Sequence, residues 1–277
     1  MLRLQLFRRV RLLATLVFMV GAARAVGAQD TAQPYFSVNR PNVLMMISTS
    51  TADAGIARQA LAYALTTVNF PVTFLDDAKL LNKQTLSQFQ VFIQFGPARY
   101  TPDQEKALAD FVNNGGGFLA LHDALDGPRG GPYEKLLGGS LVRHAGPYHI
   151  VIHLTDNGRK SPLTSGVQDF EILEDQIFPK YELDPNVPRG GWGQGRGGGE
   201  AGPPHSLMTG FAMDNTSDPE RLKLRTNIIT NPIAGWWHEV GKGRVCYLAP
   251  GDNYATMNNP MMQKLYTNAL VWLARQN

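Results

Sequence analysis

A histidine and an aspartate follow directly on an apolar run in the stretch GGGFLALHDALDG, residues 115–127. The run at 118–121 is typical of a buried strand, and His122 and Asp123 stand at its carboxyl end. Histidine has an ordinary pKa close to neutral pH, and a neighbouring carboxylate can orient its ring and stabilise its charged form. We therefore expect His122 and Asp123 to support general acid–base chemistry.

Small residues flank this histidine at the second position on each side, Ala120 and Ala124. The pattern small-x-His-x-small has the spacing of a nucleophile elbow, a sharp strand-to-helix turn that requires small neighbours because backbones approach closely. An elbow would hold the His122 ring in the crevice beyond the strand ends, where open parallel sheets bind ligands. The alternative is that His122 only ends the strand and bonds a nearby carbonyl group.

The elements around the elbow predict an α/β doubly wound fold. Apolar strands without alternation, separated by helices, indicate a parallel sheet that is covered on both faces. The segment after Thr101 carries a strong helix start, because Thr101 can cap, Pro102 suits the first helical position and Gln104 completes a capping box. Strands are expected at 42–49, 71–77, 90–96, 117–122 and 148–154, helices at 52–68, 102–114, 133–137 and 260–275, and a β-hairpin at 232–251 that turns at 241–243.

The first 28 residues predict a secretory signal peptide. Four arginines precede an apolar run at 12–20, which is followed by small residues ending at Ala28, the expected cleavage site, with Ala25 as the second choice. The apolar run is about half the length of a membrane span, so no stable span is expected after cleavage. A polar tether at 29–41 and one α/β domain at 42–277 follow, with a glycine-rich insertion at 188–204 whose composition suits a mobile surface loop.

Charge and cysteine content agree with an exported protein that has no nucleic-acid role. The signal segment holds five of the 26 basic residues and no acidic one, which leaves 21 basic against 23 acidic residues in the mature chain. A nucleic-acid partner would need a basic surface, which this balance does not provide. The single Cys246 lies in an apolar strand pattern, where core packing is expected. We predict a periplasmic or secreted location.

Four motifs in order resemble the ThuA family, named for trehalose utilisation. They are FVNNGGGFLALHDA around the elbow, YEKLLGGSLVRH at 133–144, SPLTSGVQDFEILEDQIF at 161–178, and GKGRVCYLAPGDNYATMNNPMMQKLYTNALVWLA at 241–274. The resemblance implies a flavodoxin-like, mostly parallel sheet of the class I glutamine amidotransferase-like fold, with a C-terminal β-hairpin and helix. It also implies a role in carbohydrate metabolism, on glycosides or 3-keto sugars. Amidotransferases of this superfamily carry a cysteine at the elbow, and His122 replaces it here, so glutaminase activity is excluded.

The resemblance also assigns residues. His122 matches the elbow histidine, His144 ends a Gly-Gly-x-x-x-x-His segment, and Asp175 matches the aspartate of an Asp-Glu-x-Tyr motif. The chain departs from the family at four positions: Gln176 and Phe178 stand where glutamate and tyrosine are usual, Ser161 where a His-Pro pair is common, and Asp252 near a usual Gly-His pair. Either other carboxylates do the acid–base work, or the protein binds sugars without turnover.

The histidines also suggest a metal site. His122, His144 and a carboxylate could hold zinc or a similar divalent ion, with water completing the coordination. His149 and His153 are four residues apart on an expected strand, so they share a face and could be a solvent-facing pair.

The leading hypothesis is an exported sugar hydrolase, lyase or isomerase that binds a small carbohydrate in a crevice around His122. The alternative is a noncatalytic carbohydrate-binding or interaction protein of the same fold. Substrate, reaction and oligomeric state stay open. The expected catalytic residues are His122, Asp123, Asp175 and Asp252, and the expected substrate-binding residues are His144, Glu174, Asn253 and Tyr254.

Overall fold

One sheet of nine strands runs through residues 40–48, 51–181, 205–212 and 233–276, which are the residues that the computed structural model describes. The predicted signal peptide, most of the tether and the glycine-rich insertion lie outside these residues. The strand order is β2-β1-β3-β4-β9-β8-β7-β5-β6. The sheet has a parallel half, β2 to β9 in this order, and an antiparallel half, β8 to β6.

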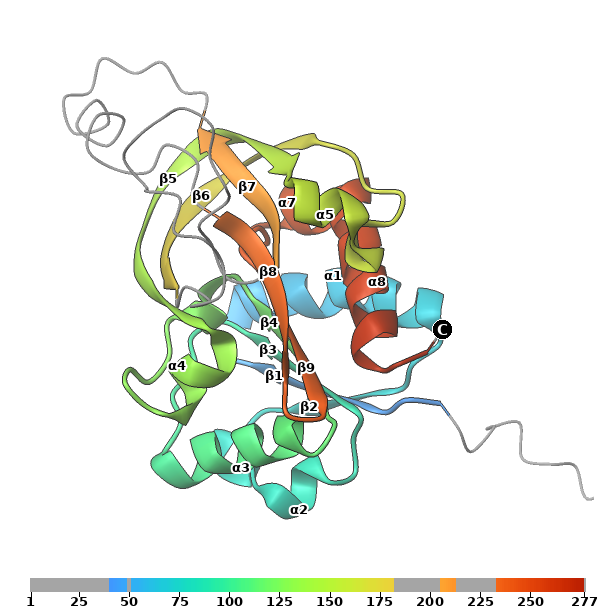
Figure 1. Ribbon diagram of the computed structural model, residues 1–277, viewed down its shortest axis with the longest axis vertical. Coiled ribbons are helices and arrows are strands. Elements are labelled where there is room, and N and C mark those ends of the chain that lie inside the picture. Colours follow the sequence, from blue (N-terminus) through green and yellow to red (C-terminus); the bar gives the residue numbers. More distant parts are fainter. Residues whose placement is uncertain (1–39, 49–50, 182–204, 213–232, 277) are drawn as a thin grey trace, which may run out of the picture. The chain divides into compact units, whose positions relative to one another are not determined.

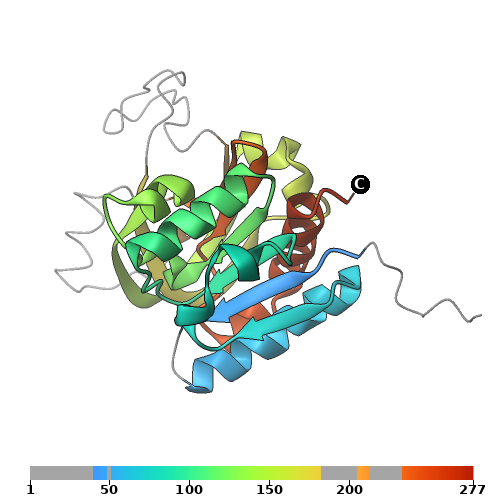
Figure 2. The ribbon, with the colours of Figure 1, turned by 90° about the horizontal axis from the view of Figure 1, so that it is seen from below.

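The parallel half is the doubly wound layer that the sequence predicts. Its five strands pair only in parallel with one another, and helices cover both faces (Figures 1 and 2). The side chains of β1, β3, β4 and β9 are therefore almost all buried, whereas the edge strand β2 buries only Leu75. Helices α1 and α8 pack together on one side, and α2, α3 and α4 lie on the other. The strands are β1 (Val43–Ile47), β2 (Val72–Leu75), β3 (Val91–Phe95), β4 (Gly117–Leu121) and β9 (Gly243–Leu248).

A local sequence signal explains where helix α3 begins. Helix α3 (Pro102–Asn113) starts with a capping box, in which the Thr101 side chain accepts from the Gln104 backbone and the Gln104 side chain accepts from the Thr101 backbone. The other helices are α1 (Thr51–Val68), α2 (Lys83–Leu86), α4 (Pro132–Leu137), α5 (Asp156–Lys160), α7 (Tyr254–Met257) and α8 (Pro260–Leu273), with 3-10 turns η1 (Ala78–Leu80), η2 (His122–Leu125) and η3 (Pro162–Thr164).

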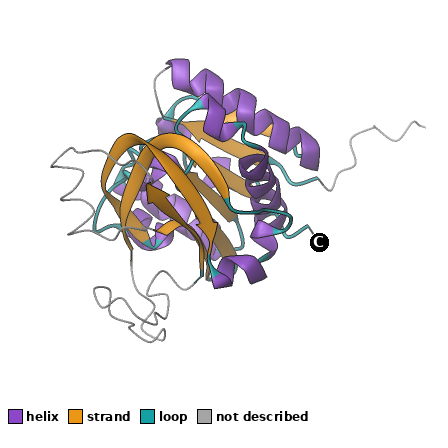
Figure 3. Cartoon of the chain, turned by 90° about the horizontal axis from the view of Figure 1, so that it is seen from above, coloured by secondary structure: helices purple, strands orange, loops and turns teal. Residues whose placement is uncertain are grey.

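The antiparallel half is built on two long strands that curve away from the parallel layer (Figure 3). β5 (Gly139–Leu154) pairs with β6 (Phe170–Tyr181) along most of its length, and register shifts interrupt the ladder between Leu141 and Arg143 and between Ala145 and Tyr148. Such irregularities increase local twist and bending. β7 (Ser206–Ala212) and β8 (Ile233–Val240) join this pair to β9.

Every strand and helix that the sequence predicts is present, and the strands that it misses lie in this half; it also misses the short helices α2, α5 and α7. The hairpin of β8 and β9 turns at the predicted glycines, and Trp236 of β8 is buried. The sequence does not predict β6 and β7, and β5 begins nine residues before the expected strand at 148–154. None of the helices in the described part of the chain is long and apolar enough to cross a membrane.

Candidate functional site

His122 occupies the sharp turn that the flanking alanines predict. It directly follows β4, and its φ of 46° lies in the left-handed region, which is uncommon for a residue with a side chain. Such a conformation costs on the order of 1–3 kcal/mol and occurs at active sites as well as at helix ends. The chain continues as the short 3-10 turn η2 and not as a full helix, so the elbow presents no helix N-terminus to a ligand.

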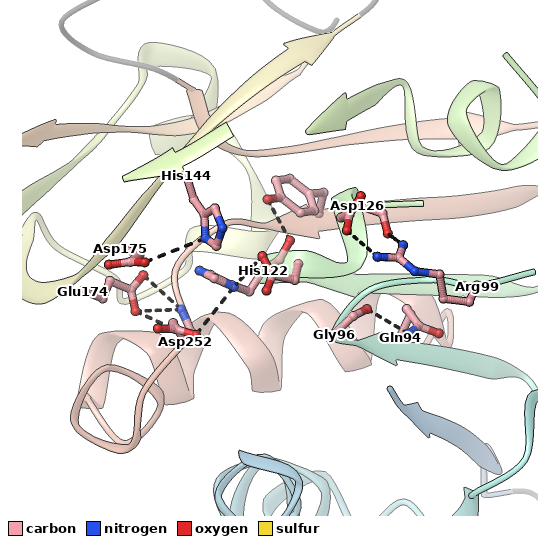
Figure 4. A network of polar contacts seen from close by, with 12 residues as sticks. Gln94, Gly96, Arg99, His122, Asp126, His144, Glu174, Asp175 and Asp252 are labelled. Carbon is pink, nitrogen blue, oxygen red and sulfur yellow. Dashed lines mark hydrogen bonds and ion pairs between the residues drawn. The ribbon is translucent and has the colours of Figure 1, made fainter. Parts of the chain in front are cut away.

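Hydrogen bonds from three directions hold the backbone of the elbow. The Tyr247 hydroxyl donates to the His122 carbonyl oxygen at 3.1 Å, and the Tyr133 hydroxyl donates to the Ala124 carbonyl oxygen at 2.7 Å. Arg99 forms an ion pair with the Asp126 carboxylate at 2.7 Å and also donates to the Asp126 carbonyl oxygen at 2.8 Å (Figure 4). The strained turn is therefore fixed by the surrounding parallel half.

The two nitrogens of the His122 ring have different surroundings. Nδ1 lies 3.3 Å from a carboxylate oxygen of Asp123 and 3.9 Å from one of Asp252. Nε2 is buried and has no hydrogen-bond partner among the described residues. Carboxylates at Nδ1 favour the proton on that nitrogen, as in catalytic triads, so Nε2 is the atom available for proton transfer.

Opposing effects act on the pKa values of His122 and Asp123. Burial lowers the pKa of His122, but the contact with Asp123 and the negative charges of Asp123, Glu174 and Asp252 outweigh it, and the pKa is raised. For Asp123, burial raises the pKa, but the contact with His122 and the nearby charges of His144 and Arg99 outweigh burial, so the pKa is lowered. The ion pair of an imidazolium and a carboxylate is thus favoured.

Glu174 lies beside this pair and is almost completely buried, with 3% of its surface exposed. Its carboxylate accepts the backbone N–H of Gly251 at 3.1 Å and that of Asp252 at 3.1 Å. Burial is the main reason why the pKa of Glu174 rises to about 7, against the opposing effects of His122 and these two N–H groups. The carboxyl also borders a small apolar cavity of about 20 Å³. That cavity is lined chiefly by Ile150, Ile152, Ile172, Ile177, Ala234, Ala249 and Pro250.

His144 and Asp175 form a second, more exposed pair above His122 (Figure 4). The His144 Nδ1 lies 3.8 Å from an Asp175 carboxylate oxygen, and the side chains are 48% and 32% exposed. The two family departures next to them have structural roles. The Gln176 amide donates to the Gly210 carbonyl oxygen at 2.9 Å, and the Phe178 ring lies under the Arg143 guanidinium, 4.7 Å from ring centre to Cζ.

The two predicted substrate-binding residues that follow Asp252 differ in their surroundings. The Asn253 Oδ1 caps α7 by accepting the Thr256 backbone N–H, and its Nδ2 donates to the Leu173 carbonyl oxygen of β6 at 2.8 Å. Both polar atoms of this side chain are therefore engaged within the protein. Tyr254 is half exposed and leaves its ring open to solvent.

A resident metal does not fit these residues. No group of three or more His, Cys, Asp or Glu side chains in the described ranges is arranged to hold an ion. His122 directs Nδ1 toward carboxylates, and His149 and His153 lie exposed on one face of β5, where His153 contacts Asp169 at 2.9 Å. Cys246 is buried in β9, and burial raises the pKa of its thiol, so it offers no nucleophile.

Comparison with known proteins decides the family. The profile of the ThuA family, described as trehalose utilisation, matches residues 42–188. The chain belongs to the ThuA family. No curated protein matches it.

Solved structures agree in fold. The chain is similar to a ThuA-like protein from Bacteroides uniformis, at 16% identity and a TM-score of 0.60, covering 87% of this chain and 94% of that one. It is also similar to a cytoplasmic protein from Salmonella typhimurium, at 11% identity and a TM-score of 0.55, covering 84% and 98%. A β-galactosidase from Rahnella sp. shares the fold over 87% of this chain and 32% of that one, at 13% identity and a TM-score of 0.50.

Sequence reasoning missed the residues that brace the elbow. Arg99, Tyr133 and Tyr247 come from three separate segments, and their role depends on tertiary pairing that no local pattern encodes. For Asn253 a local signal was available, because asparagine is among the preferred N-cap residues and directly precedes the helix at 254–257.

Proposed function

We propose that this ThuA-family protein is an exported carbohydrate-processing enzyme that acts on a glycoside or 3-keto sugar by acid–base chemistry at His122. The observation that carries the proposal is the buried, unpartnered Nε2 of His122, on a left-handed turn that the parallel half of the described chain holds rigidly. The family description, trehalose utilisation, supports the carbohydrate part. The predicted signal peptide supports export, to the periplasm or the exterior.

Proton transfer at Nε2 can serve either of two reactions, cleavage of a glycosidic bond or removal of a proton from a carbon next to a sugar carbonyl. When protonated, Nε2 donates its proton to a glycosidic or carbonyl oxygen of the sugar, and when neutral it accepts a proton from a carbon next to that carbonyl. Asp123 and Asp252 hold Nδ1 and stabilise the charged ring, which favours the donor role near neutral pH. A second acid–base group is needed on the other side of the substrate. Asp175, paired with His144, faces the same region as His122 (Figure 4), and its carboxylate can take a proton from water or from the substrate.

A second candidate function is carbohydrate binding without turnover. It is favoured by the 2% exposure of His122 and by Gln176, whose amide serves an internal hydrogen bond where the family usually carries a titratable glutamate. Calorimetry that shows binding of a disaccharide or keto sugar, together with product analysis that shows no conversion, would establish this second function in place of the first.

The deciding experiment is a product screen of the purified mature chain on glycosides and their 3-keto forms, with and without added zinc or manganese. Once a substrate converts, His122→Asn is the sharpest variant, because asparagine tolerates a positive φ but transfers no proton. Turnover should fall on the order of a hundredfold or more, as expected for a positioned acid or base.

The matched control is His153→Gln, which alters an exposed histidine nine residues along β5 from His144. Its ring contacts Asp169 and not the carboxylates around His122, so turnover should stay unchanged. Equal turnover in His122→Asn and the wild type would remove His122 from the mechanism. Cell fractionation of the full chain tests export separately, and retention of the uncleaved chain in the cytoplasm would contradict it.

A further inference from the structure

The loop that carries Asp252 is fastened to a strand that is distant in the sequence. The loop follows β9, whereas the fastening groups belong to β6, which is the last strand of the antiparallel half. The Glu174 carboxylate accepts two consecutive backbone N–H groups, those of Gly251 and Asp252, at 3.1 Å each. Next to it, Nδ2 of Asn253 donates to the Leu173 carbonyl oxygen at 2.8 Å. We call these contacts the clamp.

The backbone inside the clamp has little freedom. Gly251 has a φ of +136°, a conformation that residues with side chains rarely adopt, and a Cβ there would lie 2.9 Å from the buried Tyr266 hydroxyl oxygen. The Glu174 carboxylate is 3% exposed, so its hydrogen bonds to the loop do not compete with bulk water. The clamp therefore fixes where the Asp252 side chain begins.

Asp252 itself has no comparable restraint at its carboxylate. Its side chain is 48% exposed, and the carboxylate lies 3.9 Å from Nδ1 of His122. A single ion pair at this distance, with one partner half exposed to water, is weak and cannot by itself hold a loop in place. The position of the Asp252 charge is therefore set by the Asp252 backbone, which hydrogen bonds to β6 hold in place.

We propose that Glu174 and Asn253 are positioning residues, which act on His122 through Asp252 by holding residues 251–253 against β6. This inference rests on the proposed function in that His122 is taken as the group that transfers the proton. It reassigns two residues that the sequence suggested as substrate-binding. Glu174 also acts on His122 directly through its charge, whereas Asn253 is neutral, so Asn253 gives the cleaner test.

The test uses the dual role of the Asn253 side chain. Serine is as good an N-cap as asparagine but is too short to reach Leu173 as well, so Asn253→Ser keeps the start of α7 and removes the Leu173 contact from the clamp, while the Glu174 contacts stay. The matched control is Asn259→Ser. Asn259 likewise caps α8 through Oδ1 and donates through Nδ2 to a β6 carbonyl, that of Glu171 at 3.4 Å, but it does not adjoin Asp252.

Two measurements on the mature chain report whether the clamp holds residues 251–253, and neither needs a substrate. The first is the pKa of His122 from the NMR titration of its ring, measured in Asn253→Ser, Asp252→Asn, the double variant and Asn259→Ser. The pKa should fall in Asp252→Asn, fall in the same direction in Asn253→Ser, fall no further in the double variant, and stay at the wild-type value in Asn259→Ser. The second readout is amide hydrogen exchange, which should accelerate at Gly251 and Asp252 in Asn253→Ser and stay unchanged in Asn259→Ser.

A His122 pKa in Asn253→Ser that equals the wild-type value overturns the proposal. So does a fall of the same size in the Asp252→Asn background, because Asn253 would then act without Asp252.

If Asn253→Ser does not fold, Glu174→Gln replaces it and is measured both in the wild type and in the Asp252→Asn background. A larger fall in the His122 pKa when the Asp252 carboxylate is present supports the clamp, and equal falls overturn it. The proposed function fails separately, on the product screen, since neither readout requires turnover.

Discussion

The two halves of the sheet contribute to the site in different ways. The parallel half supplies His122, 2% exposed, on a backbone held by Tyr133 and Tyr247. The antiparallel half supplies the more exposed pair His144 and Asp175 and, through the clamp, the placement of Asp252. The buried histidine and its nearest carboxylate, Asp123, thus belong to the parallel half, whereas His144, Asp175 and the restraint on the Asp252 backbone come from the antiparallel half.

Truncation of the core under the elbow should have the largest effect on stability. Phe118 in β4 is fully buried and stacks on Phe92 at 5.6 Å, so Phe118→Ala should lower the free energy of unfolding by about 3–5 kcal/mol. Leu173→Ala is the counterpart in β6, where the side chain is 51% exposed, and should change it by about 0.5 kcal/mol or less. Urea denaturation measures both, and comparable losses would contradict the contrast between the halves.

The pH dependence of stability should reveal Glu174. Its pKa is about 7 in the folded protein against an ordinary 4.5, so the folded state holds the proton where the unfolded state has lost it. Stability should therefore fall as pH rises above about 4.5 and level off above about 7, by up to about 3 kcal/mol. The raised pKa of His122 adds a further fall above its ordinary value of 6.5.

Glu174→Gln isolates this contribution. In that variant the decline between pH 4.5 and about 6.5 should disappear, because the amide does not titrate, and only the fall that His122 contributes should remain above it. Urea titrations at several pH values measure it. A variant that keeps the full decline would assign it to another group.

Hydrogen bonds to the elbow should matter more than those at the β6 edge. Tyr247→Phe leaves the buried His122 carbonyl without its 3.1 Å donor and should lower the free energy of unfolding by about 1–2 kcal/mol. Asn259→Ser removes an exposed contact of 3.4 Å while keeping the helix cap, so about 0.5 kcal/mol or less is expected. Thermal or urea unfolding of Tyr247→Phe and Asn259→Ser measures both losses of stability. A larger loss in Asn259→Ser than in Tyr247→Phe would place the rigid part of the site in the antiparallel half.

The sequence predicts the parallel half well because each signal there is local. Thr101 and Gln104 specify a helix start by themselves, and the alanines around His122 specify a tight turn. The fold and the family are confirmed, while the roles of the site residues stay predictions.

The antiparallel half is harder to predict for a physical reason. In β6 the inward positions after Ile172 are Glu174 and Gln176, both buried. Polar residues at positions that normally hold apolar ones break the alternation by which a strand is identified. They are polar because one carboxylate fastens the Gly251 loop and one amide bonds Gly210, contacts that exist only after folding.

The asparagines that cap α7 and α8 have a consequence for solubility. Among the residues that the structure describes, β6 is the last strand of the sheet, and an unpaired strand edge is a template on which another chain can add a strand and begin to aggregate. Asn253 and Asn259 occupy the carbonyl groups of Leu173 and Glu171 on that edge. At these two positions an added strand would meet carbonyl groups that already accept a hydrogen bond from within the chain.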